Sequence, residues 1–519
     1  MPPFVNLIPS LVLGVLSVLA LVLKDRAKLI AGRILLSAAT LLVVGFYAMM
    51  LVNPTGINKL QTGAAAARVE VPLKIHAMFS VGIGRVWEAV FSRKPGDKRI
   101  IEVSTAGIGP VAKTAVVALD KFVKESPDPA VTKAKLIAVL CAGAKKKDCQ
   151  RADKLSEDLV KSALDREHKI GEALRSAFFK APTSAEKLQE HEKTIETTLP
   201  PGWFRDYILL SLYRAGDKRL YDTFATKLED NYCASFYKAS ALFSIGVIGF
   251  LVGLVFLIIQ LGFVSRRDLR QIAEGEKPEI AVPLSSAFVV LVAWQATQIC
   301  MGQLLKLLPE GALKALGHNP IGLALFMMVS YLVTMGPAIL YIHFLVLKPR
   351  GLSLVKSLNI RWKTASAGPF KMLTAGVLYW CACLPLVVLA SILAGYTGST
   401  GSDNPVLAQI VSAAKGPDPT VLILLFFTIA VLAPICEEII FRGFLYGVLR
   451  SNKGAFLALI GSAFVFSAIH LDKGGLFMLF SIGFVLALCY ERTRSLIPCF
   501  ITHGMWNGGT LILSVALFS

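Results

Sequence analysis

Long apolar stretches separated by short basic loops dominate this chain. Ten stretches reach or approach the length that a helix needs to cross a bilayer: 5–23, 34–52, 241–264, 284–307, 321–346, 372–394, 421–449, 455–470, 476–490 and 496–517. The eighth and ninth are the shortest. The pattern predicts an all-α polytopic membrane protein with about ten transmembrane helices.

One long polar segment, roughly residues 53–238, interrupts this pattern after the second stretch. Within it, 130–160 and 202–230 each contain an apolar helix pattern, a short basic turn and an amphipathic helix pattern. Tetratricopeptide-like repeats and a plain helical bundle would both produce this arrangement. We therefore divide the chain into two N-terminal spans (1–52), an inserted and mainly helical domain (53–238), spans three to five with their loops (239–369), and a C-terminal core (370–519).

The placement of positive charge predicts the topology. The chain is 55% hydrophobic, with a mean hydropathy of +0.62, which excludes an ordinary soluble protein. Its net charge of +19 lies largely in loops between apolar stretches, as the positive-inside rule expects, and no nucleic-acid-binding module is recognisable. We expect a lipid bilayer as surroundings and no nucleic-acid partner.

The first apolar stretch has no Lys or Arg before it, while Lys24, Arg26 and Lys28 follow it. This bias is not that of a cleavable signal, and it places the N-terminus and the 53–238 domain outside. We expect a multi-pass protein of a bacterial cytoplasmic membrane, with every short basic loop in the cytoplasm.

Cysteines give little indication of a cofactor. Cys141 and Cys149 flank the basic turn of the 130–160 pattern, where either a disulfide or two free thiols would fit an exported domain. The other cysteines match no metal-ligand spacing, so we expect neither a metal site nor another cofactor.

The apolar stretch 421–449 contains three charged residues, Glu437, Glu438 and Arg442. Ionisable side chains at membrane depth are energetically costly and are functional candidates by default. Glu438 and Arg442 are four residues apart on one helix face and are expected to pair, which leaves Glu437 as the unpaired carboxylate. Pro434 is expected to bend the helix or open its hydrogen bonding near the acids.

Two later stretches contain polar side chains at helical spacing. Phe466 and His470 are four residues apart, as are His503 and Asn507. Either cluster alone would be an ordinary interhelical contact, but with the acid pair they predict one site inside the bilayer. Counted along the helices, Glu437, His470 and His503 lie about 18, 22 and 11 Å from the cytoplasmic side, at roughly 1.5 Å per residue.

Small residues accompany this chemistry. Both 443–447 and 504–508 follow the GxxxG pattern, which allows helices to approach closely. Spans three to six, by contrast, carry little polar chemistry, and glutamines such as Gln260 and Gln295 are expected to make interhelical hydrogen bonds.

These residues resemble the motifs of the CAAX prenyl endopeptidase and bacteriocin-processing (CPBP) group of intramembrane proteases. EEIIFR at 437–442 matches EExxxR, FSAIH at 466–470 matches FxxxH, and HGMWN at 503–507 matches HxxxN, in the same order. The resemblance covers roughly residue 370 to the C-terminus. The first two spans and the inserted domain have no counterpart in the minimal pattern.

The resemblance implies a glutamate-type intramembrane endopeptidase. Glu437 and His470 would activate a water, His503 and Asn507 would stabilise the oxyanion, and Glu438 and Arg442 would brace the helix. It also implies a membrane-anchored protein or peptide substrate, either a prenylated CAAX tail or an exported tethered protein cleaved near its C-terminus. The inserted domain favours the second and could capture substrate or dock a partner protein.

Three other classes compete with this interpretation. Glu437, His470 and His503 could ligate zinc in a membrane metalloprotease, although no HExxH is present. Intramembrane Glu and His also serve as relays in transporters, but no inverted repeat is recognisable. A catalytically idle scaffold would have no reason to retain buried charges.

The topology can be tested by labelling single cysteines introduced at positions 180 and 356 in a cysteine-free background. Residue 180 should react with a membrane-impermeant thiol reagent added outside, and residue 356 only after the membrane is opened, because basic short loops stay in the cytoplasm. Reaction of both positions from the same side would contradict the predicted topology.

Overall fold

The chain folds entirely from helices in the part that the structure describes. The structure is a computed structural model, and it describes residues 70, 73–83, 109–126, 128–143, 146–262, 280–305, 309, 319–364, 367–396, 410, 413, 418–470, 472 and 475–518. No β-strand occurs among these residues, which confirms the all-α prediction for them. The predicted spans 5–23 and 34–52 lie outside the described residues.

Two compact units make up the chain. The helical unit comprises the described residues of Leu60–Phe243, Pro405–Lys415 and Leu513–Ser519, and the membrane unit comprises those of Ser244–Asn404 and Gly416–Ile512. The boundary between Phe243 and Ser244 falls inside one long helix, α11 (Lys218–Gly262).

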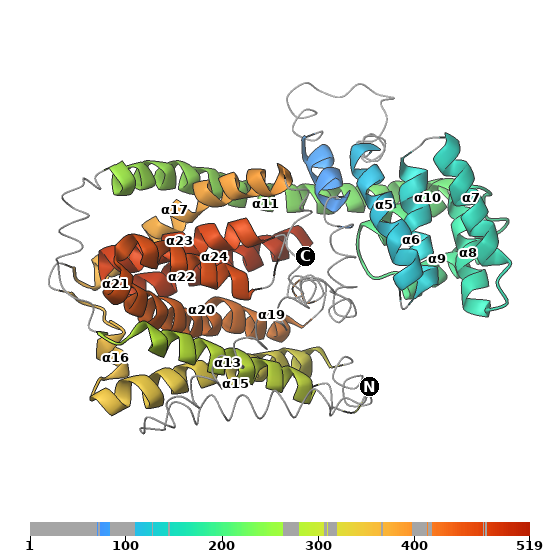
Figure 1. The fold of residues 1–519 in the computed structure, drawn as a ribbon. Coiled ribbons are helices and arrows are strands. Elements are labelled where there is room, and N and C mark those ends of the chain that lie inside the picture. The colour runs from blue at the N-terminus through green and yellow to red at the C-terminus, as the bar shows by residue number, and fades with distance from the viewer. Residues whose placement is uncertain are drawn as a thin grey trace. The chain divides into compact units, whose positions relative to one another are not determined.

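Short helices of similar length build the helical unit: α5 (Gly109–Glu125), α6 (Pro129–Ala142), α7 (Lys146–Val160), α8 (Asp165–Phe178), α9 (Ala185–Thr198) and α10 (Trp203–Gly216). Each packs against the next, and α6, α8 and α10 also pack against one another (Figure 1). Asp128 and Ser184 cap the N-termini of α6 and α9 by accepting hydrogen bonds from backbone N–H groups. The unit is therefore layered, with α6, α8 and α10 on one side.

Both predicted helix–turn–helix patterns are present. The first corresponds to α6 and α7, and the second to α10 and the start of α11. Cys141 and Cys149 are free thiols, so the disulfide alternative is not the one found. Burial, together with the neighbouring Cys149 and Asp153, raises the pKa of the Cys141 thiol to about 12. Because the thiolate is the reactive form, Cys141 is a poor nucleophile at neutral pH.

The membrane unit contains α13 (Leu284–Leu305), α15 (Pro320–Tyr341), α17 (Pro369–Tyr396), α22 (Ala455–Ile469), α23 (Leu476–Thr493) and α24 (Leu496–Phe518). A π-helical segment, η3 (Ile342–Leu347), continues α15. Between α17 and α22, one helical run from Pro419 to Lys453 combines α19 (Pro419–Phe426), η5 (Phe427–Leu432), α20 (Ala433–Glu438), η6 (Ile439–Tyr446) and α21 (Gly447–Lys453). Within this unit α23 packs against both α17 and α22, and α15 packs against α13, α19 and α20.

Six described helical segments are long and apolar enough to cross a bilayer: Lys218–Leu261, Leu284–Gly302, Pro320–Arg350, Pro369–Ala394, Pro419–Lys453 and Leu476–Thr493. They coincide with the third to seventh and the ninth predicted spans. Helix α22 is apolar but short, and α24 is long but carries His503 and Asn507, which lower its hydropathy. The chain is thus a multi-pass membrane protein, whereas the total of ten spans and the extracytoplasmic location of 53–238 stay predictions.

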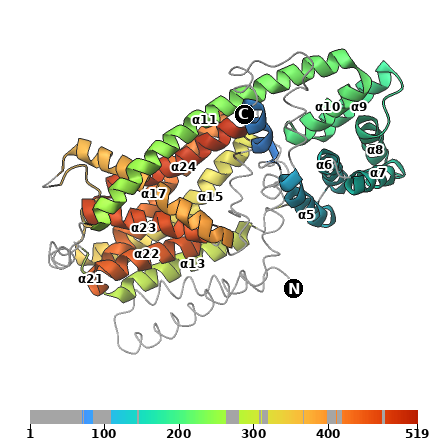
Figure 2. The same cartoon turned by 90° about the horizontal axis from the view of Figure 1, so that it is seen from above.

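Helices α11 and α17 cross with almost no space between them (Figure 2). A Cβ atom at Gly253 would lie 2.0 Å from the backbone oxygen of Cys381, and one at Gly249 would lie 2.9 Å from Leu384. Only glycine allows this approach, which brings the two backbones into van der Waals contact.

A buried carboxylate ties α23 to the end of the Pro419–Lys453 run. Glu491 accepts hydrogen bonds from the Tyr446 hydroxyl (2.5 Å), from Arg450 Nε (3.1 Å) and from Arg494 Nη2 (3.0 Å). Two cations and a hydroxyl thus compensate for the burial of this charge.

The α11–α17 crossing generates a matched pair of variants. Gly253→Ala should destabilise the protein by about 1–3 kcal/mol, because the new methyl group overlaps the backbone of α17. Gly246→Ala on the same helix meets no atom within 4 Å and should be neutral or stabilise by up to about 1 kcal/mol. Thermal melting of detergent-purified variants measures both effects, and equal melting temperatures would contradict the crossing.

Candidate active site within the membrane helices

The helical run from Pro419 to Lys453 positions the acid pair. Its backbone stays helical through Pro434, since Leu432 and Ala433 both have right-handed helical dihedral angles. The predicted disturbance at Pro434 takes the form of π-helical turns, η5 before and η6 after the α-helical turn that ends at Glu438. Hydrogen bonding is therefore loosened near the acids without a break in the helix.

This loosening leaves one backbone carbonyl without a donor in its own helix. The N–H of Ala433 bonds to the oxygen of Thr428, so the oxygen of Ile429 would need a donor from position 434, and Pro434 has no N–H. The Asn507 side chain of α24 fills this role, with its Nδ2 donating to the Ile429 oxygen at 2.9 Å. Asn507 therefore joins α24 to the acid-bearing helix.

The two glycines of the 504–508 pattern lie beside the same stretch of the acid-bearing helix. A Cβ at Gly504 would lie 2.7 Å from the Ala430 oxygen, and one at Gly508 would lie 3.2 Å from Phe426. The expected close helix approach is confirmed at this contact, and it brings His503 of the same helix to the acids.

Glu438 and Arg442 form the predicted pair, and both side chains are completely buried. Arg442 Nη1 donates to Glu438 Oε1 at 2.8 Å, while Nη2 donates to the Gly483 oxygen of α23 at 3.1 Å. The same Glu438 oxygen lies 2.8 Å from Nδ1 of His503. One buried carboxylate oxygen thus holds a guanidinium and an imidazole from two segments.

Glu437 points to a different side, as its spacing predicts, and its side chain is 10% exposed. Its Oε1 accepts a hydrogen bond from the Tyr331 hydroxyl of α15 at 2.8 Å. Its Oε2 has no hydrogen-bond partner. That oxygen lies 3.9 Å from Nε2 of His470 and 3.8 Å from Nε2 of His503.

The hydrogen-bond partners of both imidazoles define their orientation. Nδ1 of His470 lies 2.6 Å from the Phe466 oxygen, which can only accept, so this nitrogen carries a hydrogen. Nδ1 of His503 faces Glu438 in the same way. Both Nε2 atoms are therefore directed toward Glu437, and in the neutral rings both are acceptors.

Phe466 packs against all three groups. Its ring, which is fully buried, lies 4.4 Å from the Arg442 guanidinium carbon, 4.7 Å from the His470 ring and 5.9 Å from the His503 ring. The phenylalanine of the FxxxH pattern is thus an apolar surface against which Arg442 and both imidazoles pack.

The site brings together Glu437, Glu438, Arg442, His470 and His503, although their counted depths differ. Counting residues along each helix ignores helix tilt and the reach of side chains. These two effects account for the differences between the counted depths. Asn507 is not one of this group: its side chain bonds to the Ile429 carbonyl of the acid-bearing helix, as described above. The site is closed around Glu438 and Arg442 and opens at His470, whose side chain is 29% exposed.

Tyr331 is the contact that the sequence did not predict. It lies in the fifth predicted span, where little polar chemistry was expected. A hydroxyl in an apolar helix needs a hydrogen-bond partner, and this requirement is the only feature of the sequence that points to Tyr331. It could not identify Glu437 as the partner, because the two residues are 106 positions apart.

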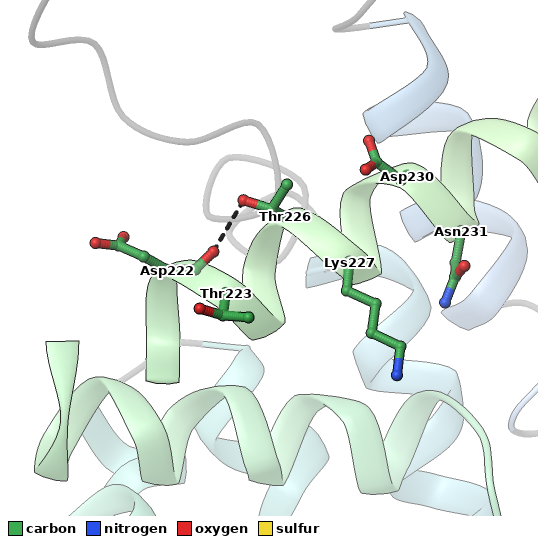
Figure 3. A pocket seen from close by; sticks show the side chains of 6 residues that line it. All are labelled: Asp222, Thr223, Thr226, Lys227, Asp230 and Asn231. Atoms are coloured by element: carbon green, nitrogen blue, oxygen red, sulfur yellow. Dashed lines mark hydrogen bonds between the residues drawn. The ribbon is translucent and has the colours of Figure 1, made fainter. Parts of the chain in front are cut away.

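Another recess lies in the helical unit. Figure 3 shows its six lining side chains along one stretch of α11: Asp222, Thr223, Thr226, Lys227, Asp230 and Asn231. The Thr226 hydroxyl donates to the backbone oxygen of Asp222 (2.9 Å), an ordinary contact within a helix. These residues show no convergence comparable to that around Glu437.

Comparison with known proteins assigns a family to the acid-bearing region. Residues 419–509 match the family model described as Type II CAAX prenyl endopeptidase Rce1-like. A relative in Bacillus subtilis (strain 168), described as "Putative membrane peptidase YdiL", is 30% identical over 92 residues. The alignment covers 18% of this chain and 38% of the relative. No solved structure matches the chain. Residues 419–509 therefore form an Rce1-like domain of the CPBP family, which contains every predicted site residue.

The buried pair generates a prediction about stability. Glu438→Ala leaves the buried Arg442 without its carboxylate, and Arg442→Ala leaves the buried Glu438 without its guanidinium. Each change should therefore lower the free energy of unfolding by roughly 3–5 kcal/mol. The double variant should be destabilised by less than the sum of the two effects, because neither charge is then left alone. Melting of detergent-purified variants provides the measurement.

Glu437→Ala is the matched control, since it removes the neighbouring carboxylate, which has no Lys or Arg partner among the described residues. We expect little loss of stability from it. Additive effects at Glu438 and Arg442, or a lower melting temperature for Glu437→Ala than for either, would contradict this assignment.

Proposed function

We propose that the membrane unit is a glutamate-type intramembrane endopeptidase. In this proposal Glu437 and His470 activate a water that hydrolyses a peptide bond of a membrane-associated protein. The observation that carries the proposal is the buried Oε2 of Glu437, which lacks a hydrogen-bond partner and faces the Nε2 atoms of His470 and His503 at 3.9 and 3.8 Å. These separations are too long for direct hydrogen bonds and suit a bridging water.

The two acceptors would orient this water for attack. Glu437 Oε2 accepts one of its hydrogens and His470 Nε2 accepts the other, which leaves an oxygen lone pair free. As the water oxygen bonds to the scissile carbonyl carbon, the proton passes to Glu437 and the carbonyl π electrons move to its oxygen. The C–N bond then breaks, and the leaving amine nitrogen takes the proton from Glu437.

The tetrahedral oxyanion needs hydrogen-bond donors. His503 would donate from Nε2 when both of its ring nitrogens carry a hydrogen, with Nδ1 held by Glu438. Asn507 has two hydrogens on Nδ2, of which one is given to Ile429, so the second is the one assigned to the oxyanion. Both donors lie on α24.

Glu438 and Arg442 act indirectly in this scheme. They hold His503 and connect the acid-bearing helix to α23 through Gly483. An imidazole whose Nδ1 is fixed by a carboxylate keeps a defined orientation, which is a recurring role of such partners in enzymes.

The substrate class follows from the surroundings of the site. A scissile bond must reach Glu437 among membrane helices, so the substrate is itself membrane-anchored. The family description refers to CAAX prenyl endopeptidases, which makes a prenylated C-terminal peptide the first substrate to examine. C-terminal processing of an exported tethered protein is the alternative, because the helical unit could hold such a protein near the membrane.

Glu437→Gln tests the proposal directly. It keeps the shape of the side chain and removes the base, so cleavage should fall at least about 100-fold. The assay uses purified protein in lipid vesicles with an internally quenched farnesylated CAAX peptide, together with a comparison of membrane proteomes of cells carrying either form. Uncleaved precursors that accumulate with Glu437→Gln would identify the substrates.

Glu491→Gln is a suitable control, because it neutralises another buried carboxylate of the same unit. It should lower stability while the folded fraction still cleaves. The same assays with a chelator distinguish the zinc-dependent alternative: activity should persist, and loss that zinc restores would favour a metalloprotease. Full turnover by Glu437→Gln would contradict the proposed role of Glu437 as the base.

A further inference from the structure

Tyr331 lies on α15, outside the 419–509 domain, and is firmly held there. Trp294 of α13 is fully buried and donates from its indole nitrogen to the Thr334 oxygen (2.9 Å), one turn beyond Tyr331. Further along α15, Tyr341 shares a hydrogen bond of 2.9 Å with Thr297 of α13. The opposite contacts of α15 are with α19 and α20. Helix α15 is therefore fixed between α13 and the acid-bearing helix.

The single hydroxyl hydrogen of Tyr331 has two acceptors within reach. Glu437 Oε1 lies at 2.8 Å and the backbone oxygen of Ala433 at 3.5 Å. The carboxylate oxygen is both closer and charged, so the hydrogen is donated to Glu437.

This bond distinguishes two oxygens that are otherwise equivalent. The terminal torsion of a glutamate is broad and roughly two-fold, so either oxygen could face the histidines. With Oε1 occupied by Tyr331, Oε2 remains without a partner and faces His470 and His503. The carboxylate plane is thereby fixed relative to both imidazoles.

We propose that Tyr331 is a positioning residue that orients the Glu437 carboxylate through its hydrogen bond to Oε1. The proposal rests on the function proposed above, in which Oε2 is the base. Helix α15 is consequently part of the active machinery as well as of the scaffold, and the machinery extends beyond the family domain.

The test compares Tyr331→Phe with Tyr341→Phe, which both delete one hydroxyl from α15. Tyr331→Phe should lower kcat roughly 10- to 100-fold, the scale of a misplaced catalytic group, with KM within about twofold. Tyr341→Phe should leave kcat unchanged, and the two variants should melt at similar temperatures. The substrate is the farnesylated CAAX peptide in lipid vesicles.

Infrared spectroscopy provides a measurement that does not depend on activity. In protein labelled with ¹³C-glutamate, the difference between wild type and Glu437→Gln identifies the carboxylate stretch of Glu437. Tyr331→Phe should shift this band and Tyr341→Phe should not. In a Glu437→Gln background the effect of Tyr331→Phe should disappear.

The possible outcomes separate the two proposals. An unshifted band with Tyr331→Phe, or a kcat equal to that of Tyr341→Phe, overturns the positioning role, as does a loss of activity that only follows a loss of folded protein. Full activity of Glu437→Gln overturns the proposed function instead. If the wild type does not cleave the peptide, the infrared comparison decides the positioning role.

Discussion

The Glu438 carboxylate, shared between Arg442 and His503, is the interaction on which the rest of the site depends. An isolated charge among membrane helices would be strongly unfavourable, and a single ion pair often only breaks even. Here one Glu438 oxygen accepts hydrogen bonds from Arg442 of its own helix and from His503 of α24. Arg442 also donates to the Gly483 carbonyl, which connects α23 to the same group. Burial of the charge is thus compensated by contacts that hold the acid-bearing helix, α23 and α24 in one arrangement.

The backbone around Pro434 provides a second constraint of the same kind. A proline and a π-helical turn leave the Ile429 carbonyl without a donor, and a buried carbonyl requires one. Asn507 supplies it, while Gly504 gives the space for α24 to approach. The asparagine that is proposed to donate to the oxyanion therefore also has a structural role, and the proposed donation would use the second hydrogen of its amide group.

The ion pair and most of the membrane spans could be predicted from the sequence, because both depend on the spacing of residues along the chain. Four residues between Glu438 and Arg442 predict their pair, and the apolar lengths predict the spans that the described helices contain. The Tyr331–Glu437 contact could not be predicted, since it joins helices far apart in the chain whose rotation only tertiary packing determines. The π-helical turns could not be predicted either. A proline predicts that the helix is disturbed, but not that the disturbance takes the form of π-helical turns.

Adjacent positions on one helix explain why the two acids differ. Neighbouring side chains diverge by about 100°, so Glu438 turns toward Arg442 and His503 while Glu437 turns toward α15. All the cations and imidazole nitrogens within hydrogen-bond distance gather on Glu438 Oε1. One oxygen of each acid is buried without a partner, but only that of Glu437 faces two imidazole nitrogens, at 3.9 and 3.8 Å. Such an oxygen is unfavourable in a static core. It is tolerable where a water completes its hydrogen bonding, and that water is the reactant a hydrolase needs.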